Sequence, residues 1–225
     1  MPTHKKIFIL GGIVASVVAV VCLLFIPAPY KLIGSLVGYL GVLMASLNYQ
    51  KTSKKIYAHI KELDASHQYK EVVNYVSQVK PLGYGGFVID SYLLYAYYEL
   101  GDFKAYEETV LNMRGTRTWN RPKFADFRNK VMDNVACMAL IKEMADHGTV
   151  NYAGKNLMMM QAVAHYKDGN KEAITQLMND YPKLPKLKKA CMYILSGNFE
   201  ALEGYYESEI AVNVINEIKG RYKNG

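Results

Sequence analysis

Apolar positions divide the chain into a hydrophobic start and a longer part with helical periodicity. One uncharged apolar segment runs from Ile7 to Ile26, and a second runs from Leu32 to Tyr49. A helix of roughly 20 apolar residues crosses the hydrocarbon core of a bilayer, and about 17 residues is the lower limit. The pattern therefore predicts a transmembrane helical hairpin in residues 1–50, followed by a separate domain in residues 51–225.

Beyond Lys51 the spacing of the apolar residues is helical. They recur at intervals of three and four positions, and no stretch alternates as a half-buried strand would. Glycine, proline and polar clusters interrupt this periodicity at 81–86, 115–122, 147–149, 181–185 and near Gly197. These breaks predict an all-α domain of roughly nine or ten helices joined by short turns, including one long helix over 124–146.

Four of the predicted turns share a sequence pattern. They begin at His67, Gly101, Gly169 and Gly197, and each follows an apolar helix and precedes another. In the last three, the glycine suits the left-handed conformation that ends a helix, and the following Asp or Asn can cap the next one. The first two turns are 34 positions apart, the next two are 68 apart, and the last step is 28. The spacing indicates a repeat of about 34 residues.

The stretch 91–103 gives the clearest repeat unit. Its aromatic and small residues, followed by Gly101 and Asp102, resemble the first helix and turn of the tetratricopeptide repeat (TPR) superfamily. The resemblance extends unevenly over 53–209 and implies a TPR-like solenoid of stacked antiparallel helix pairs. A generic array of helical hairpins would have the same architecture. The closing prolines of the family are displaced or missing, and its usual alanine lies one position early at Ala105, Ala173 and Ala201.

The distribution of charge predicts an orientation for the apolar start. The net charge is +7, and six of these charges come from lysines in the first 55 residues, which contain no Asp or Glu. Basic residues are costly to translocate, so Lys5 and Lys6 before the hairpin and Lys51, Lys54 and Lys55 after it favour a cytoplasmic location for both ends. We therefore expect a multi-pass protein of the cell (plasma) membrane with a cytoplasmic domain. A cleaved signal peptide is the alternative for the first segment.

Small residues at helical spacing mark the second apolar segment. Gly34, Gly38, Gly41 and Ala45 would lie along one side of a helix. Small side chains let two helices approach closely in lipid, where packing replaces the hydrophobic driving force. This stripe predicts either packing within the hairpin or contact with another chain, including a second copy as a homo-oligomer.

By resemblance to the TPR pattern, several apolar positions would face the concave side of the solenoid. These positions form a candidate peptide groove: Tyr95, Tyr98, Met159, Val163 and Tyr166. Aromatic and methionine side chains suit a surface that takes up peptides, because they offer large contact areas at low entropic cost. Packing in the core between helices is the alternative for the same residues.

A second candidate surface consists of basic and aromatic residues that would touch lipid. The loop 114–121 holds the only tryptophan, Trp119, and three arginines without an acidic residue. Its Arg117 and Trp119, together with the lysines at 51, 54 and 55, would suit anionic headgroups or an acidic partner. The alternative is that Trp119 packs onto a neighbouring helix and the arginines remain solvated.

No residue constellation predicts catalysis. The five histidines share no ligand spacing, the three cysteines form no C-x-x-C motif, and no nucleophile elbow, phosphate loop or dinucleotide fingerprint occurs. We expect no cofactor and no metal. After the N-terminal lysines are set aside, the rest of the chain is nearly neutral, so no nucleic-acid surface is expected.

These observations favour one class of function over two others. The chain is expected to be a membrane-anchored protein–protein interaction module: an adaptor, assembly factor or accessory subunit of a membrane complex without catalysis of its own. The partners would then be another protein and the lipid bilayer. The alternative is an integral subunit of a transporter or secretion machine that contacts its partners through the glycine-rich hairpin. An enzyme with an unrecognised helical active site is a third possibility.

Overall fold

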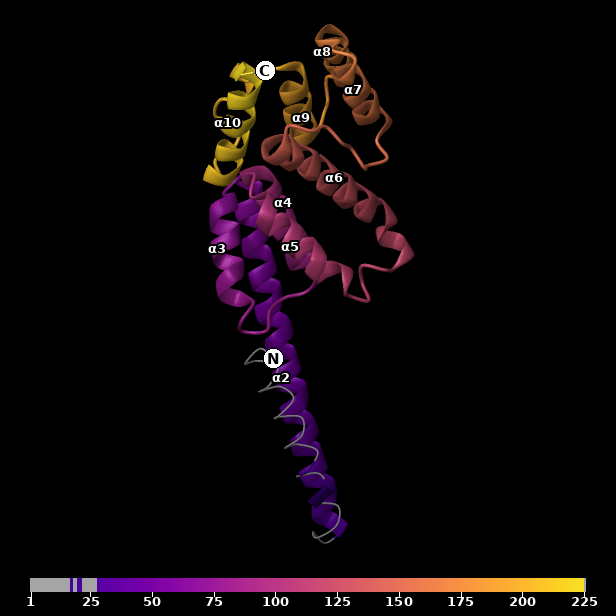
Figure 1. Ribbon diagram of the computed structural model, residues 1–225. Coiled ribbons are helices and arrows are strands. Elements are labelled where there is room, and N and C mark those ends of the chain that lie inside the picture. The colour runs from indigo at the N-terminus through magenta and orange to yellow at the C-terminus, as the bar shows by residue number, and fades with distance from the viewer. Residues whose placement is uncertain (1–16, 18–19, 22–27, 225) are drawn as a thin grey trace. The chain divides into compact units, whose positions relative to one another are not determined.

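The computed structural model describes residues 17, 20, 21 and 28–224. Within this part the chain forms α-helices α2 to α10 and two short 3-10 helices, η1 and η2, without any strand (Figure 1). The predicted all-α class is therefore confirmed for these residues. The predicted first membrane span, 7–26, lies outside the described residues except for three isolated positions.

Helix α2 (Ala28–Ala65) contains 38 residues and is longer than the sequence pattern predicted. It begins in what was expected to be a connecting turn, with Pro29 in its first turn, where the missing amide hydrogen of proline is tolerated. It then continues past the expected domain boundary at 50/51, because no glycine or proline interrupts the lysine-rich stretch there. No helix in the described part of the chain combines the length and apolar character needed to cross a membrane.

The chain divides into two compact units, residues 1–92 and 93–225, and the boundary falls within α4 (Phe87–Leu100). In the first unit, α2 packs against α3 (Tyr69–Val79). Their shared core consists of one face of each helix, since the buried residues recur every three or four positions. These residues are Ile56 and Ile60 of α2 and Val72, Val76 and Val79 of α3.

The second unit contains the remaining helices, in the order α5 (Phe103–Arg114), η1 (Pro122–Phe124), α6 (Ala125–His147), α7 (Leu157–Lys167), α8 (Lys171–Asp180), α9 (Lys186–Ser196), η2 (Glu200–Leu202) and α10 (Glu209–Asn224). Helix α6 confirms the long helix predicted over 124–146. It packs against both α9 and α10, whereas α7 and α8 pack against each other and against α9 (Figure 1). Helix α9 is accordingly buried on most of its surface, including Leu187, Cys191 and Leu195.

Three of the four predicted turns have the expected chemistry. Gly101, Gly169 and Gly197 adopt left-handed conformations with φ of +80°, +72° and +77°. The side chain after each glycine accepts a hydrogen bond from the backbone N–H three residues further on, at Ala105, Ala173 and Ala201. The pattern of glycine followed by a capping residue therefore produced correct turn predictions, because both effects act within a few residues.

One expectation about these turns was wrong, and the first turn has a different chemistry from the other three. After Gly197 no full helix forms, since η2 lasts only three residues and the chain reverses at Gly204, whose φ is +69°. The first turn lacks a glycine: His67 itself adopts φ of +56°, and the side chain of Gln68 makes no capping hydrogen bond. The described structure thus contains helix–turn–helix pairs at α4–α5 and α7–α8, but the fourth repeat is incomplete.

Candidate functional site

The five residues predicted to line a peptide groove do not form a common surface. Tyr98, Met159 and Val163 are buried, so in this conformation they belong to the core, which was the alternative interpretation. Tyr95 is 45% exposed. Tyr166 is half-buried and lines a pocket described below. The groove prediction was wrong for the three buried residues because both faces of α4 and α7 carry apolar residues. Neighbouring helices decide which face is covered, and the sequence of one helix does not show this.

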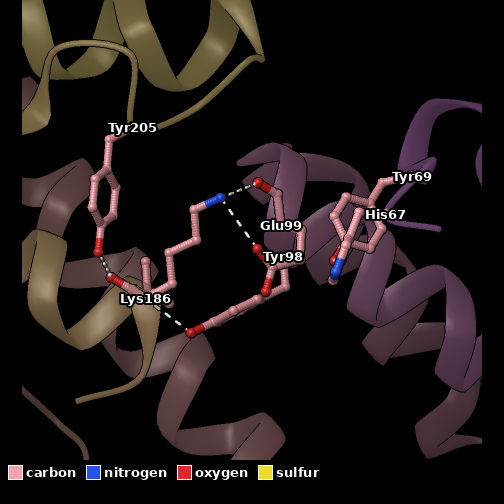
Figure 2. A network of polar contacts seen from close by, with 7 residues as sticks. His67, Tyr69, Tyr98, Glu99, Lys186 and Tyr205 are labelled. Atoms are coloured by element: carbon pink, nitrogen blue, oxygen red, sulfur yellow. Dashed lines mark hydrogen bonds and ion pairs between the residues drawn. The ribbon is translucent and has the colours of Figure 1, made fainter. Parts of the chain in front are cut away.

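Tyr98 instead belongs to a polar network at the start of α9 (Figure 2). Its hydroxyl oxygen accepts a hydrogen bond of 3.0 Å from the backbone N–H of Leu187. Pro185, the residue that precedes α9, supplies no side-chain cap, so the tyrosine hydroxyl satisfies one of the open N–H groups of this helix end. Burial raises the pKa of Tyr98, and the hydroxyl therefore stays protonated.

Lys186 completes this network by joining three chain segments (Figure 2). Its ammonium group donates to the backbone carbonyl oxygen of Glu99 at 2.8 Å and to the carboxylate of the same residue at 3.2 Å. The hydroxyl of Tyr205 donates to the carbonyl oxygen of Lys186, and the ammonium group lies 5.1 Å from the ring centre of Tyr206. The lysine is thus fully engaged, which favours a structural role. Figure 2 also shows His67 and Tyr69 of the first unit, which share a hydrogen bond of 2.6 Å across the α2–α3 turn.

Because of its buried tyrosines, the second unit is expected to lose stability at alkaline pH. Burial raises the pKa of Tyr106 to about 12. Burial also raises the pKa of Tyr206, whose hydroxyl has no hydrogen-bond partner among the described residues. In the unfolded chain both ionise near their ordinary value of about 10. Stability is therefore complete below this pH and falls as the pH rises above it, because the unfolded state then binds fewer protons than the folded state.

We expect the free energy of unfolding to fall above pH 10 by at most about 1.4 kcal/mol per pH unit for each such tyrosine. Urea unfolding between pH 9 and 12, followed by circular dichroism, measures this slope, and absorbance near 295 nm reports tyrosine ionisation. Tyr206→Phe should flatten the slope at little cost at neutral pH, because its hydroxyl makes no hydrogen bond within the described structure. An unchanged slope in this variant would contradict the assignment.

The first half of α2 exposes its apolar side chains. Seven large apolar residues between positions 36 and 47 are at least 40% exposed: Leu36, Tyr39, Leu40, Val42, Leu43, Met44 and Leu47. At about 3.6 residues per turn, Gly34, Gly38, Gly41 and Ala45 lie along one side of this helix, and the large apolar residues occupy most of the rest. A side-chain carbon added at Gly38 or Gly41 would meet no atom of the described residues within 4 Å. Gly41 and Ala45 are exposed and Gly38 is half-buried among the described residues.

The residues predicted to face lipid have different environments. Lys51, Lys54 and Lys55 are exposed on α2, directly after its apolar half. Arg117 is exposed as well. Trp119 is only 5% exposed and contacts the Phe127 ring edge to face, with ring centres 6.2 Å apart. The prediction that Trp119 touches lipid is therefore corrected, since its ring packs against a neighbouring helix.

A pocket of about 860 Å³ lies among the ends of four helices in the second unit. The ends of α6 and α7, the start of α8 and the last turns of α10 contribute to it. Its apolar and aromatic lining comes from Met144, Tyr166, Ile218 and Tyr222, and its charged lining comes from Lys167, Lys171, Glu217 and Arg221. The sequence analysis predicted a binding role for none of these charged residues, because they lie on three different helices and no local pattern connects them.

Hydrogen bonds fix two walls of this pocket. Arg221 donates to the carbonyl oxygen of Asp146, near the end of α6, at 2.9 Å, and it lies 3.5 Å from the carboxylate of Glu217. The hydroxyl of Tyr222 donates to the carbonyl oxygen of Leu195 at 3.1 Å. Burial raises the pKa of Tyr222, and a hydrogen bond with Tyr166 raises it further. The tyrosine therefore remains neutral and held in place.

Two further features of the described residues concern metal binding and cysteine chemistry. No group of three or more His, Cys, Asp or Glu side chains among them is placed to hold a metal ion. Cys137 and Cys191 are free and buried, and the pKa of Cys191 is raised by its hydrogen bond with Cys137 and by burial. A protonated, inaccessible thiol is a poor nucleophile.

In the part of the chain that the structure describes, the fold is all-helical, glycine turns join two helix pairs, and the first half of α2 exposes apolar side chains. Comparison of the chain with known protein families, with curated proteins and with solved structures found no match.

Proposed function

We propose that this protein is a membrane-anchored protein–protein interaction module without catalysis of its own, which acts as an adaptor, assembly factor or accessory subunit of a membrane complex. The observation that carries the proposal is the exposed apolar half of α2. Monomeric proteins in water rarely expose apolar patches larger than a few hundred Å². A helix that is apolar on most sides is normally covered by protein or by lipid.

The sequence around this helix favours lipid as the cover. The segment 7–26 adds twenty uncharged, mostly apolar residues directly before α2. Lys51, Lys54 and Lys55 follow the apolar half and are exposed, as residues that contact anionic headgroups would be. We propose that both apolar segments insert as a hairpin into the plasma membrane and that both ends of the chain are cytoplasmic, as the basic flanks favour.

The interaction role rests on the helix pairs. The pairs α4–α5 and α7–α8 share the same turn chemistry, which supports a degenerate TPR-like array as part of the proposal. Stacked helix pairs offer extended surfaces for other proteins and require no catalytic residues. Co-purification of the full-length protein from gently solubilised membranes would identify the partner.

A flotation experiment on the full-length protein tests the membrane proposal. The protein should float with lipid on a density gradient, resist carbonate extraction and dissolve only in detergent. Leu40→Glu with Leu43→Glu should weaken this association, because charged side chains are costly in hydrocarbon. Asn74→Glu with Gln78→Glu on exposed positions of α3 is the matched control and should float like the parent. Full-length protein that stays in solution without detergent would refute the proposal.

The second candidate function is an integral subunit of a transporter or secretion machine. It is favoured by Gly38 and Gly41, beside which no described atom would meet an added side-chain carbon, so that another helix could pack there. Gly38→Leu with Gly41→Leu separates the two candidates. Under the first, the variant floats and retains its co-purifying proteins; under the second, it floats but loses them.

A further inference from the structure

The pocket among α6, α7, α8 and α10 has features of a binding site that membrane anchoring does not explain. It lies entirely within residues 93–225, away from the apolar half of α2 in the chain. Its volume is about 860 Å³, which is comparable with that of small-molecule sites, at roughly 300–1,000 Å³, so groups of several atoms can enter it. Its lining combines cationic side chains with aromatic rings, which favours ligands that carry both negative charges and apolar groups.

The charge of the lining is positive and only partly neutralised. Lys167, Lys171 and Arg221 oppose a single acidic side chain, Glu217, among the lining residues. Arg221 already has two partners, because it donates a hydrogen bond to the carbonyl oxygen of Asp146 and lies beside the carboxylate of Glu217. Lys167 and Lys171 are exposed and form no ion pair within the described structure. The ammonium group of Lys171 lies 5.1 Å from the ring centre of Tyr222. Carboxylates can still pair with both lysines, because a cation–π contact at an exposed site is weak.

The apolar part of the pocket is well packed. The side chains of Met144 and Ile218 are buried beneath it. The rings of Tyr166 and Tyr222 lie with their centres 6.1 Å apart, and the ring centre of Phe199 lies 5.2 Å from that of Tyr222. Tyrosines that are already fixed in place lose little entropy on binding and often dominate the binding energy of protein interfaces.

We infer that this pocket binds an acidic peptide segment of a partner protein, with an apolar side chain against the two tyrosines and carboxylates on Lys167 and Lys171. An open pocket with exposed lysines suits a segment that continues past it, whereas small-molecule sites usually bury most of the ligand surface. The inference rests on the interaction role proposed above but does not require the membrane anchor. The inference assigns a binding site and a class of partner to the proposed interaction module.

The test uses full-length protein in detergent and a short fluorescein-labelled peptide in which pairs of Glu alternate with single Phe or Leu residues. Fluorescence anisotropy should show binding that weakens with added salt, because the contacts are exposed ion pairs. Lys167→Glu with Lys171→Glu should raise the dissociation constant by about tenfold or more, since attraction becomes repulsion. Lys104→Glu with Lys142→Glu, exposed lysines outside the pocket lining, is the matched control and should bind like the parent.

Three results would overturn the inference. One is equal binding by the parent and the Lys167/Lys171 variant. Another is equal binding of a peptide with Gln in place of every Glu. The third is displacement of the peptide by ATP or inorganic phosphate through the same lysines, at concentrations where sodium chloride of equal ionic strength has no effect, which would assign the pocket to small phosphate compounds. The methyl resonance of Met144 in methyl-labelled protein should shift on peptide binding, with the core residue Met192 as an internal reference. Flotation does not depend on these lysines, so its outcome is separate.

Discussion

Gly101→Ala is expected to lower the free energy of unfolding by about 3 kcal/mol, whereas Gly169→Ala should lower it by only about 1 kcal/mol. Both glycines end a helix in the left-handed region, with φ of +80° and +72°, and both precede a capping residue. Alanine is strained in that conformation at either position. The two sites differ in what surrounds the added methyl group.

At Gly101 the added carbon would lie 2.7 Å from Cδ1 of Tyr206 and 2.8 Å from the side chain of Ala211. These contacts are shorter than van der Waals separation, and both neighbours are buried, so the structure must shift to admit the methyl group. At Gly169 the same carbon would meet no atom within 4 Å. Both variants share the backbone strain, so the difference between their losses in free energy of unfolding measures the cost of overpacking at Gly101.

Urea unfolding followed by circular dichroism measures both variants against the parent protein. Equal losses at the two sites would show that backbone conformation alone sets the cost and that α10 is not packed closely over the α4–α5 turn. A loss at Gly169 larger than that at Gly101 would contradict the packing around Tyr206.

Asp133→Ala is expected to cost about 3 kcal/mol, because it removes the partner of a nearly buried lysine. One carboxylate oxygen of Asp133, on α6, lies 2.5 Å from the ammonium nitrogen of Lys188 on α9. The other accepts a hydrogen bond from the hydroxyl of Tyr152, in the loop between α6 and α7. The side chains of Asp133 and Lys188 are only 16% and 13% exposed. Truncation would leave the ammonium group without its counter-charge.

A second substitution distinguishes this mechanism from a simple loss of packing. Asp133→Ala combined with Lys188→Met should recover most of the stability, because the unpaired charge is then absent. Asp126→Ala, at an exposed acid in the first turn of the same helix, is the matched control and should cost only about 0.5 kcal/mol. If the double variant were as unstable as Asp133→Ala alone, packing rather than charge would explain the loss.

Predictions from the sequence were most accurate where local chemistry decides the structure. The turns at Gly101 and Gly169 were located correctly, because a glycine and a following Asp or Asn act within a few residues of each other. The long helix α6 was found because no turn signal interrupts it. The helix expected after Gly197 did not form, since a favourable start does not provide the tertiary packing that a short helix needs.

Predictions that required knowing the neighbours of a helix were less accurate. Tyr98, Met159 and Val163 share the periodicity of a groove and of a core, and only the packing of the second unit places them inside. Trp119 likewise looked suited to a membrane surface but contacts Phe127 instead. Periodicity identifies the apolar face of a helix, but the covering of that face depends on residues distant in sequence.

The amino-acid sequence by itself determined the all-helical class, the turn positions and the concentration of uncharged residues and lysines near the start, because these follow from short-range propensities and composition. Only the tertiary structure decided which tyrosines are buried, that Lys167, Lys171 and Arg221 line one pocket, and that Asp133 meets Lys188. These groups come together through contacts between helices that are far apart along the chain. Such contacts depend on the packing of whole elements, so no local pattern encodes them.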